Sequence, residues 1–221
     1  MSALITRPSQ WWQALRREWL LYHLGDERFR FMWEAPPQAE WVALDCETTG
    51  LNVHRDEIIS IGAVPIVGDT IRTSERLELL VRPNRSISAE SVRVHGLRER
   101  DVAEGLDPDE AMMRLMRFIG SRPLVGYYLE FDVAMINRAV FPLLGVGLPQ
   151  RKIEVSAMFY DYKRRQLPPY GPDADIDLRF AVMMRELDLP LREAHIALND
   201  AVMAALAFIK LRHLLGWGEQ R

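Results

Sequence analysis

The order of strand-like and helix-like segments constrains the fold of this chain more than any other feature of its sequence. Segments rich in β-branched and apolar residues come first, at 41–44, 58–67 and 71–81, and their tight spacing predicts an antiparallel meander. A short apolar run, Leu124-Val125-Gly126, predicts a further strand. Helical periodicity occupies the rest of the second half, at 109–119, 134–140, 155–165, 178–187 and 197–215. This order predicts an α/β fold, a mixed β-sheet flanked by helices.

The first 38 residues differ from the rest and predict an N-terminal helical extension with a linker, residues 1–38, ahead of a main domain at 39–216. Within the extension, residues 9–34 are expected to form one or two short helices that end near Gly25 and before Pro36-Pro37. Apolar side chains recur there at helical spacing: Trp12, Leu15, Trp19 and Tyr22. This apolar face either packs on the chain's own core or binds a partner, and the sequence leaves both interpretations open.

Composition excludes several classes of function. Cys46 is the only cysteine of the 221 residues, which rules out an intramolecular disulfide and a cysteine-based zinc site. No run reaches about 18 apolar residues, and residues 1–10 have no signal-peptide pattern, so we expect a cytoplasmic protein without membrane contact. The net charge of −3 predicts weak non-specific affinity for nucleic acid, although it does not exclude an acidic nuclease site.

Two carboxylates follow the first predicted strand, in Asp45-Cys46-Glu47-Thr48-Thr49-Gly50. Residues two apart on a strand point to the same face, so the side chains of Asp45 and Glu47 are expected to lie together. Two such carboxylates repel each other unless a cation lies between them. Such a pair alone is common on protein surfaces, but after an apolar strand and before Thr48-Thr49-Gly50-Leu51 it indicates a cation site more strongly.

Three more polar residues complete the candidate set. Asp132 follows the strand at 124–126, where its carboxylate either binds a metal or only favours the start of a helix. His195 and Asp200 are five residues apart, about 140° around one helix, so they are not expected to share a helical face. The spacing predicts His195 on a loop and Asp200 in the first turns of the helix at 197–215. Taken alone, His195 is more often a solvated loop histidine.

In this order and at these intervals, the motifs resemble those of the DEDDh 3′-5′ exonucleases of the ribonuclease H-like superfamily. The nearest likeness is to the proofreading epsilon-subunit branch of bacterial DNA polymerase III. The segment Ser86 to Leu97, which ends in Val94-His95-Gly96-Leu97, is similar to a segment of that branch. We expect a structural role for His95. The resemblance implies a ribonuclease H-like fold for an exonuclease domain at 39–216.

The resemblance also implies a chemistry. Two divalent ions, Mg²⁺ or Mn²⁺, would bind four carboxylates, those of Asp45, Glu47, Asp132 and Asp200. His195 would act as the general base. The substrate would be the 3′ end of single-stranded nucleic acid, with DNA favoured over RNA, and the product a nucleoside monophosphate. The alternatives are an RNA-trimming exoribonuclease and a polymerase-associated binding module that acts through its N-terminal helices, with a DNA polymerase or a second copy as partner.

Substrate contacts follow from the same resemblance. Backbone groups of Thr48 and Thr49 would hold the terminal nucleotide, and Leu51 would wedge against its base. Tyr127-Tyr128 replaces a His-Asn pair that the family usually carries, so Tyr128 is expected either to stack on a base or ribose or to have a packing role. A basic run at 163–165 either follows the phosphate backbone or is a solvated helix end.

Overall fold

The computed structural model describes residues 10–167 and 176–217. A six-stranded sheet of order β3-β2-β1-β5-β6, with β4 also paired to β2, forms its centre. The strands are β1 (Glu40–Thr48), β2 (Ile58–Val67), β3 (Thr70–Ile71), β4 (Leu77–Leu80), β5 (Leu124–Gly126) and β6 (Lys152–Glu154). β1 is antiparallel to β2 and parallel to β5, and β5 is parallel to β6. The sheet is therefore mixed, as the sequence predicts.

The meander departs from the prediction at its third strand. Residues 71–81 do not form one strand, because the polar residues of η2 (Thr73–Glu75) fold into a short 3₁₀ turn between β3 and β4. Both short strands pair antiparallel with β2. The prediction of an antiparallel arrangement is confirmed, and the single strand at 71–81 is wrong.

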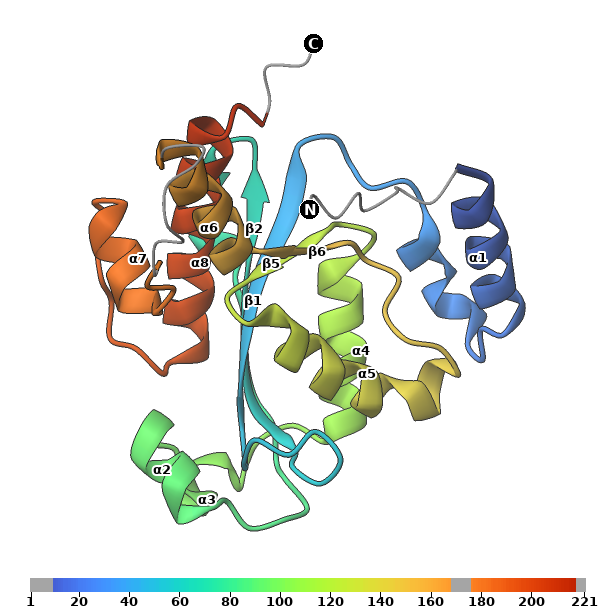
Figure 1. Ribbon diagram of the computed structural model, residues 1–221. Coiled ribbons are helices and arrows are strands. Elements are labelled where there is room, and N and C mark those ends of the chain that lie inside the picture. Colours follow the sequence, from blue (N-terminus) through green and yellow to red (C-terminus); the bar gives the residue numbers. More distant parts are fainter. Residues whose placement is uncertain (1–9, 168–175, 218–221) are drawn as a thin grey trace.

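Helices cover both faces of the sheet (Figure 1). α4 (Pro108–Ile119) and α5 (Leu129–Leu144) lie on one face, and α6 (Val155–Gln166), α7 (Phe180–Glu186) and α8 (Ala197–Leu214) lie on the other. Two short helices, α2 (Ala89–His95) and α3 (Glu99–Val102), follow β4. The predicted helix at 134–140 is longer than expected, because the helical backbone begins directly after Tyr128 and ends at Gly145.

α8 approaches the sheet closely because of one glycine. A Cβ on Gly62 of β2 would lie 2.1 Å from the backbone nitrogen of Leu198. Only glycine leaves room for this contact. Ala201, Ala204 and Ala205, on the same face of the helix, are buried. The first turns of α8 are thereby held against β2 and against β1, which carries Asp45 and Glu47.

The N-terminal extension forms α1 (Gln10–Tyr22) and the 3₁₀ helix η1 (Glu27–Trp33), as predicted for residues 9–34, while residues 1–9 lie outside the described part. The Gly25 N–H donates to the Leu144 carbonyl at 2.7 Å, which attaches the extension to the end of α5. The side chains that reach the core are Leu21, Leu24, Phe29, Met32 and Trp33.

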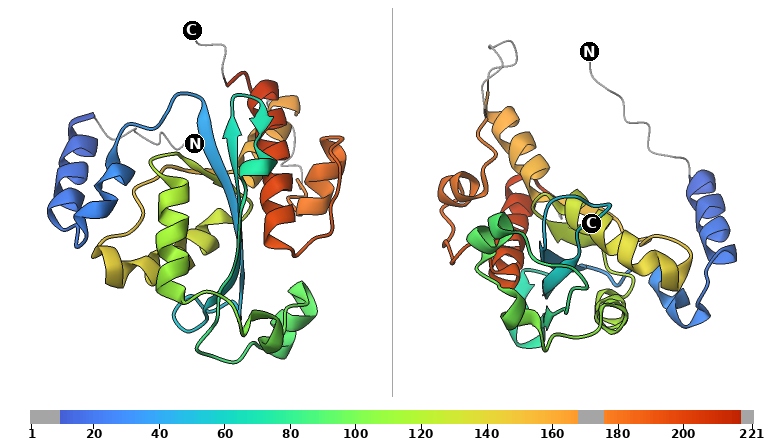
Figure 2. Two further views of the ribbon diagram at one scale, coloured as in Figure 1. Left: turned by 180° about the vertical axis from the view of Figure 1, so that it is seen from behind. Right: turned by 90° about the horizontal axis from the view of Figure 1, so that it is seen from below.

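The helical stripe of Trp12, Leu15, Trp19 and Tyr22 is exposed. The interpretation that this stripe packs on the chain's own core is therefore wrong, because Leu21 and Leu24 face the core in its place. Both views of Figure 2 show α1 at the edge of the molecule, away from α6, α7 and α8. No helix in the described part of the chain has the length and apolar content needed to cross a membrane.

Candidate active site

Asp45 and Glu47 lie near the end of β1, opposite Gly62 and Ser60 of β2. Their separation of two residues places both carboxylates on the sheet face that α8 covers. Only 9% of Glu47 is exposed. The pairing register of β1 shifts directly after Glu47, at the point where the chain leaves the sheet.

Asp132 lies in the first turn of α5 and connects that helix to β1. Its Oδ1 accepts a hydrogen bond from the Cys46 N–H at 3.1 Å. The N-cap of α5 is Tyr128, so Asp132 does not cap the helix. Because Cys46 stands between Asp45 and Glu47 in β1, this bond places a third carboxylate beside the pair.

His195 and Asp200 are arranged as the sequence predicts, one on a loop and one in the first turn of α8. The His195 N–H donates to Asp200 Oδ2 at 2.8 Å, and the backbone of His195 has a positive φ of 62°. Glu47, His195 and Asp200 each present a ligand atom within 4.8 Å of the others. Asp200 Oδ1 is buried and has no hydrogen-bond partner among the described residues.

Burial and mutual repulsion raise the pKa values of the carboxylates in the site. Burial, with repulsion from Asp132, Asp200 and Glu47, raises the pKa of Asp45 well above its usual range. Burial raises the pKa of Asp132 to about 8, and burial with repulsion from Asp200 raises the pKa of Glu47 to about 7. The pKa of Asp200 is raised by burial as well. Acidic groups that are crowded and poorly solvated fit a divalent cation, because its charge stabilises their ionised forms.

All five candidate residues line one cleft of about 1130 Å³. Thr48, Leu51 and Tyr128 line the same cleft. Leu51 is 84% exposed and stands on a loop that Asp56 fixes, since the Asn52 N–H donates to Asp56 Oδ2 at 2.7 Å. A Cβ on Gly50 would lie 2.5 Å from the same oxygen, so a larger residue here would displace the Asp56 carboxylate that holds the loop.

Thr49 does not line the cleft. Its N–H donates to the Glu57 carbonyl at 2.9 Å, and its own carbonyl accepts from the Ser88 N–H at 3.1 Å. Its hydroxyl bonds to Asp56 at 3.3 Å and accepts from the Glu57 N–H at 3.0 Å. The structure thus gives Thr49 partners within the protein, and its contact with a nucleotide stays a prediction.

His95 supports the neighbouring Thr48. Its Nδ1 accepts from the Leu97 N–H at 3.1 Å, which leaves the proton on Nε2, 3.2 Å from the Thr48 carbonyl. Burial lowers the pKa of His95, and nearby His195 lowers it further. His95 therefore fixes the end of β1, which agrees with the structural role expected for it.

The sequence analysis missed several residues of the cleft, among them Lys152, Glu154, Phe180 and Arg192. None of them belongs to a motif, and only the folded chain brings them to the cleft. The basic run at 163–165 is absent from the described lining of the cleft. Lys163 pairs with Glu186 at 2.8 Å. This pairing favours the interpretation of the run as a solvated helix end.

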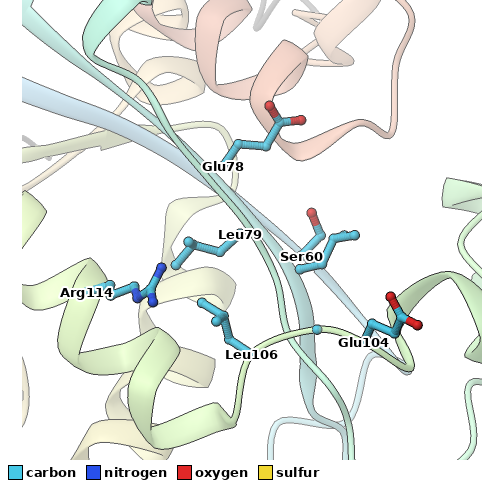
Figure 3. A pocket seen from close by; sticks show the side chains of 8 residues that line it. Ser60, Glu78, Leu79, Glu104, Leu106 and Arg114 are labelled. Carbon is cyan, nitrogen blue, oxygen red and sulfur yellow. The ribbon is translucent and has the colours of Figure 1, made fainter.

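A second pocket, of about 510 Å³, lies beside β4 and α4 and contains none of the candidate residues. Figure 3 shows Glu78 and Glu104 apart from each other there, with Leu79 and Leu106 between the strand and Arg114. Among the described residues, the group of three metal-ligating side chains lies in the carboxylate cleft and not here. The candidate catalytic and metal-binding residues are therefore grouped in the carboxylate cleft.

Known proteins resemble this chain in sequence and in fold. A DNA polymerase III of the PolC type from Thermotoga maritima is 27% identical over 177 residues, which cover 80% of this chain and 12% of that protein. A DNA polymerase III subunit epsilon-like protein from Rhodobacter capsulatus is 30% identical over 172 residues, covering 77% of this chain and 23% of that protein. This chain thus spans only a small part of the length of either relative.

Among solved structures, E. coli exonuclease I in complex with a dA16 oligonucleotide matches with a TM-score of 0.67 at 14% identity, covering 81% of this chain and 42% of that one. The match confirms the expected ribonuclease H-like arrangement of a mixed sheet flanked by helices. The exonuclease family RNase_T matches residues 42–208, which include every candidate residue of the cleft. Because this match extends over most of the sequence, the chain belongs to the RNase_T exonuclease family.

Proposed function

We propose that this chain is a metal-dependent 3′-5′ exonuclease that releases nucleoside 5′-monophosphates from single-stranded nucleic acid, with DNA favoured over RNA. The observation that carries the proposal is the meeting of four carboxylates, from β1, α5 and α8, and one imidazole, from the loop before α8, in a single cleft. Membership of the exonuclease family supports the reaction. The DNA-bound exonuclease I of similar fold and the polymerase III relatives support the choice of DNA.

The carboxylates fit a pair of divalent ions, Mg²⁺ or Mn²⁺. Asp132 and Asp200 each use one oxygen to accept a backbone N–H, so the second oxygen of each is available to a cation. The buried, unpartnered Oδ1 of Asp200 supports this arrangement most directly. With Asp45 and Glu47, these residues would hold the ions. The ions would supply a water of lowered pKa and would neutralise the charge of the phosphate.

The residues of the chain would then perform the remaining steps. The imidazole of His195 accepts a proton from the attacking water. The water oxygen bonds to phosphorus while the bond from phosphorus to the 3′ oxygen of the preceding nucleotide breaks. The products are a nucleoside 5′-monophosphate and a strand shorter by one nucleotide with a free 3′ hydroxyl. The exposed position of His195 on its loop supports this role, because the imidazole can reach a water above the carboxylates.

We assign substrate contacts to Thr48, Thr49, Leu51 and Tyr128. Leu51 and Tyr128 are 84% and 63% exposed in the same cleft, and apolar or aromatic surface of this kind suits nucleobases. Thr48 is held by His95, so its position is well defined. Backbone groups of Thr49 would contact the terminal nucleotide, while its hydroxyl, bonded to Asp56, holds the turn that carries Leu51.

The exposed stripe of α1 suits a second role in which it binds a DNA polymerase or another copy of this chain. Its support is the exposure of Leu15, Trp19 and Tyr22 together with the polymerase III relatives. α1 lies at the edge of the molecule, away from α6, α7 and α8, so a partner bound to its exposed stripe would leave that side of the cleft open.

The experiment that tests the proposed function is a paired digestion. Single-stranded DNA and RNA of one sequence, each labelled at the 5′ end, are incubated with the protein in Mg²⁺, in Mn²⁺ or with a chelator. We expect a ladder that shortens from the 3′ end only with metal, faster on DNA, and no ladder with Asp45→Ala. The absence of a metal-dependent ladder on both strands would refute the proposal, and faster RNA digestion would correct its substrate.

A further inference from the structure

Two cations line the carboxylate cleft, Lys152 at the start of β6 and Arg192 in the loop before α8. The Arg192 guanidinium donates to Asn199 Oδ1 at 3.4 Å, and the backbone N–H of Arg192 donates to Met203 Sδ at 3.3 Å. Lys152 is exposed, and its ammonium group has no ion-pair partner in the described ranges. Lys152 is therefore a cation of the cleft that is available to a ligand.

The neighbouring carboxylate does not neutralise Lys152. Glu154, two residues further along β6, accepts from the Leu129 N–H at 2.9 Å and from the N–H and hydroxyl of Ser156 at 3.0 and 2.7 Å. These neutral donors hold the Glu154 carboxylate toward the start of α5. Since side chains two apart on a strand are about 7 Å from each other, Lys152 stays separate from this group.

The position of Lys152 suits a phosphate other than the one that is cleaved. In the sheet, β5 lies between β1 and β6, and the pairing register sets Lys152 level with Leu124 of β5 and Val42 of β1. Two strand spacings across the sheet and three residues along it place the Lys152 Cα roughly 14 Å from the Asp45 Cα. Leu51, which we assign to the terminal nucleotide, follows the end of β1. A single-stranded substrate that places its terminal nucleotide at Leu51 and its scissile phosphate at the carboxylates can continue toward β6.

Three aromatic side chains of the same cleft, those of Tyr127, Tyr128 and Phe180, form an aromatic wall. The rings of Tyr127 and Phe180 are stacked, with centroids 4.4 Å apart and planes at 9°, and the Tyr128 ring meets Tyr127 at 4.5 Å. The Tyr127 hydroxyl donates to the Leu178 carbonyl at 3.0 Å, which fixes the wall to the start of α7. Aromatic faces beside a cation are the combination that binds single strands without reading their sequence.

We propose that Lys152 and this wall form a binding subsite for the strand upstream of the scissile bond, with Lys152 in contact with a phosphate. The inference rests on the proposed function and names its substrate class. The substrate is an unpaired oligonucleotide strand with phosphates beyond the scissile one. A mononucleotide ester fills only the part of the cleft at the carboxylates.

The test compares two substrates that differ in upstream phosphates. A short single-stranded oligothymidylate has them, whereas thymidine 5′-(4-nitrophenyl phosphate) has none and reports the chemistry at the carboxylates alone. The variants are Lys152→Gln, the charge-retaining Lys152→Arg, and Lys210→Gln as a control that removes the same charge from α8, outside the cleft lining. The value of kcat/KM is measured on both substrates over a range of salt concentrations.

We expect Lys152→Gln to reduce the slope of log kcat/KM against log salt on the oligonucleotide by about 0.7, the value for one phosphate contact on a single strand. Its activity on the oligonucleotide falls more than its activity on the ester, while Lys152→Arg and Lys210→Gln keep the slope of the unaltered chain. An unaltered slope for Lys152→Gln, or equal losses on both substrates, would overturn the subsite. If the unaltered chain cleaves neither substrate with metal, the proposed function fails first, and the subsite fails with it.

Discussion

Replacing Glu47 with glutamine should stabilise the metal-free protein at alkaline pH, although it removes a residue that we assign to metal binding. Glu47 is only 9% exposed, and burial with repulsion from Asp200 raises its pKa to about 7. Glutamine has nearly the same shape and carries no charge. In a chelator, the folded protein must hold an ionised Glu47 at pH 8, whereas the variant has no such group.

The size of the effect follows from the pKa. A rise from 4.5 to about 7 is about 2.5 units, and each unit corresponds to about 1.4 kcal/mol, so the full effect is about 3 kcal/mol. A raised pKa means that the folded state favours the protonated form. The stability that this group contributes is therefore fully present below about pH 4.5 and is lost as the pH rises through about 7. The gain from glutamine should be small at about pH 5 and approach about 3 kcal/mol at about pH 8.

The assay is urea unfolding of the unaltered chain and of Glu47→Gln, in chelator at both pH values and again with Mg²⁺ or Mn²⁺. With Mg²⁺ or Mn²⁺ at the higher pH, the unaltered chain should become the more stable of the two proteins. The cation stabilises the ionised glutamate and binds less tightly to the glutamine of the variant. Glu104→Gln is the matched control, since Glu104 is an exposed glutamate outside the carboxylate cleft. If Glu47→Gln destabilised the metal-free protein equally at both pH values, the argument that the buried, ionised Glu47 lowers the stability of the folded state would be refuted.

Two further predictions concern catalysis. His195→Ala should keep metal binding, measured by calorimetry, and lower kcat by about 10²- to 10⁴-fold, while the same change at exposed His54 should have no effect. A His195→Ala enzyme as active as the unaltered chain between roughly pH 6 and 9 would exclude the imidazole as the base. Tyr128→Ala should raise KM for single-stranded DNA by about 5- to 150-fold, the equivalent of about 1–3 kcal/mol for one stacked base, and Tyr128→Phe should not. Equal KM values for the two Tyr128 variants would show that the ring does not contact the substrate.

The carboxylate cleft was predictable because local geometry determines much of it. Side chains two residues apart on a strand point to the same face of the sheet, which places Asp45 and Glu47 together. Residues five apart lie about 140° from each other around a helix, so His195 and Asp200 were expected on separate elements, a loop and α8. These relations hold for any strand or helix, so they could be derived before the tertiary structure was known.

Other features depend on contacts that periodicity does not reveal. β6 has three residues, too few for an alternating pattern, so neither the strand nor the place of Lys152 in the cleft could be derived. The stack of Tyr127 on Phe180 joins residues that are far apart in the sequence. In α1, periodicity identifies an apolar stripe, but two apolar faces compete for the core, and it is Leu21 on the other face that packs there.

Under the proposed function, the carboxylates that would bind a cation are held in place by the fold, and the residues that would contact the nucleic-acid strand are exposed. Asp132 is held by the backbone of β1, and Asp200 is held by the N–H of His195 and by a helix that Gly62 allows against the sheet. These bonds limit how far the carboxylates can move apart to relieve their repulsion, and a cation bound between them would gain affinity from that constraint. Leu51 is 84% exposed on the loop after β1. Under the proposed function the division follows from the fold, since strands and buried helices would supply the ligands and the connections between them would supply the contacts with the nucleic-acid strand.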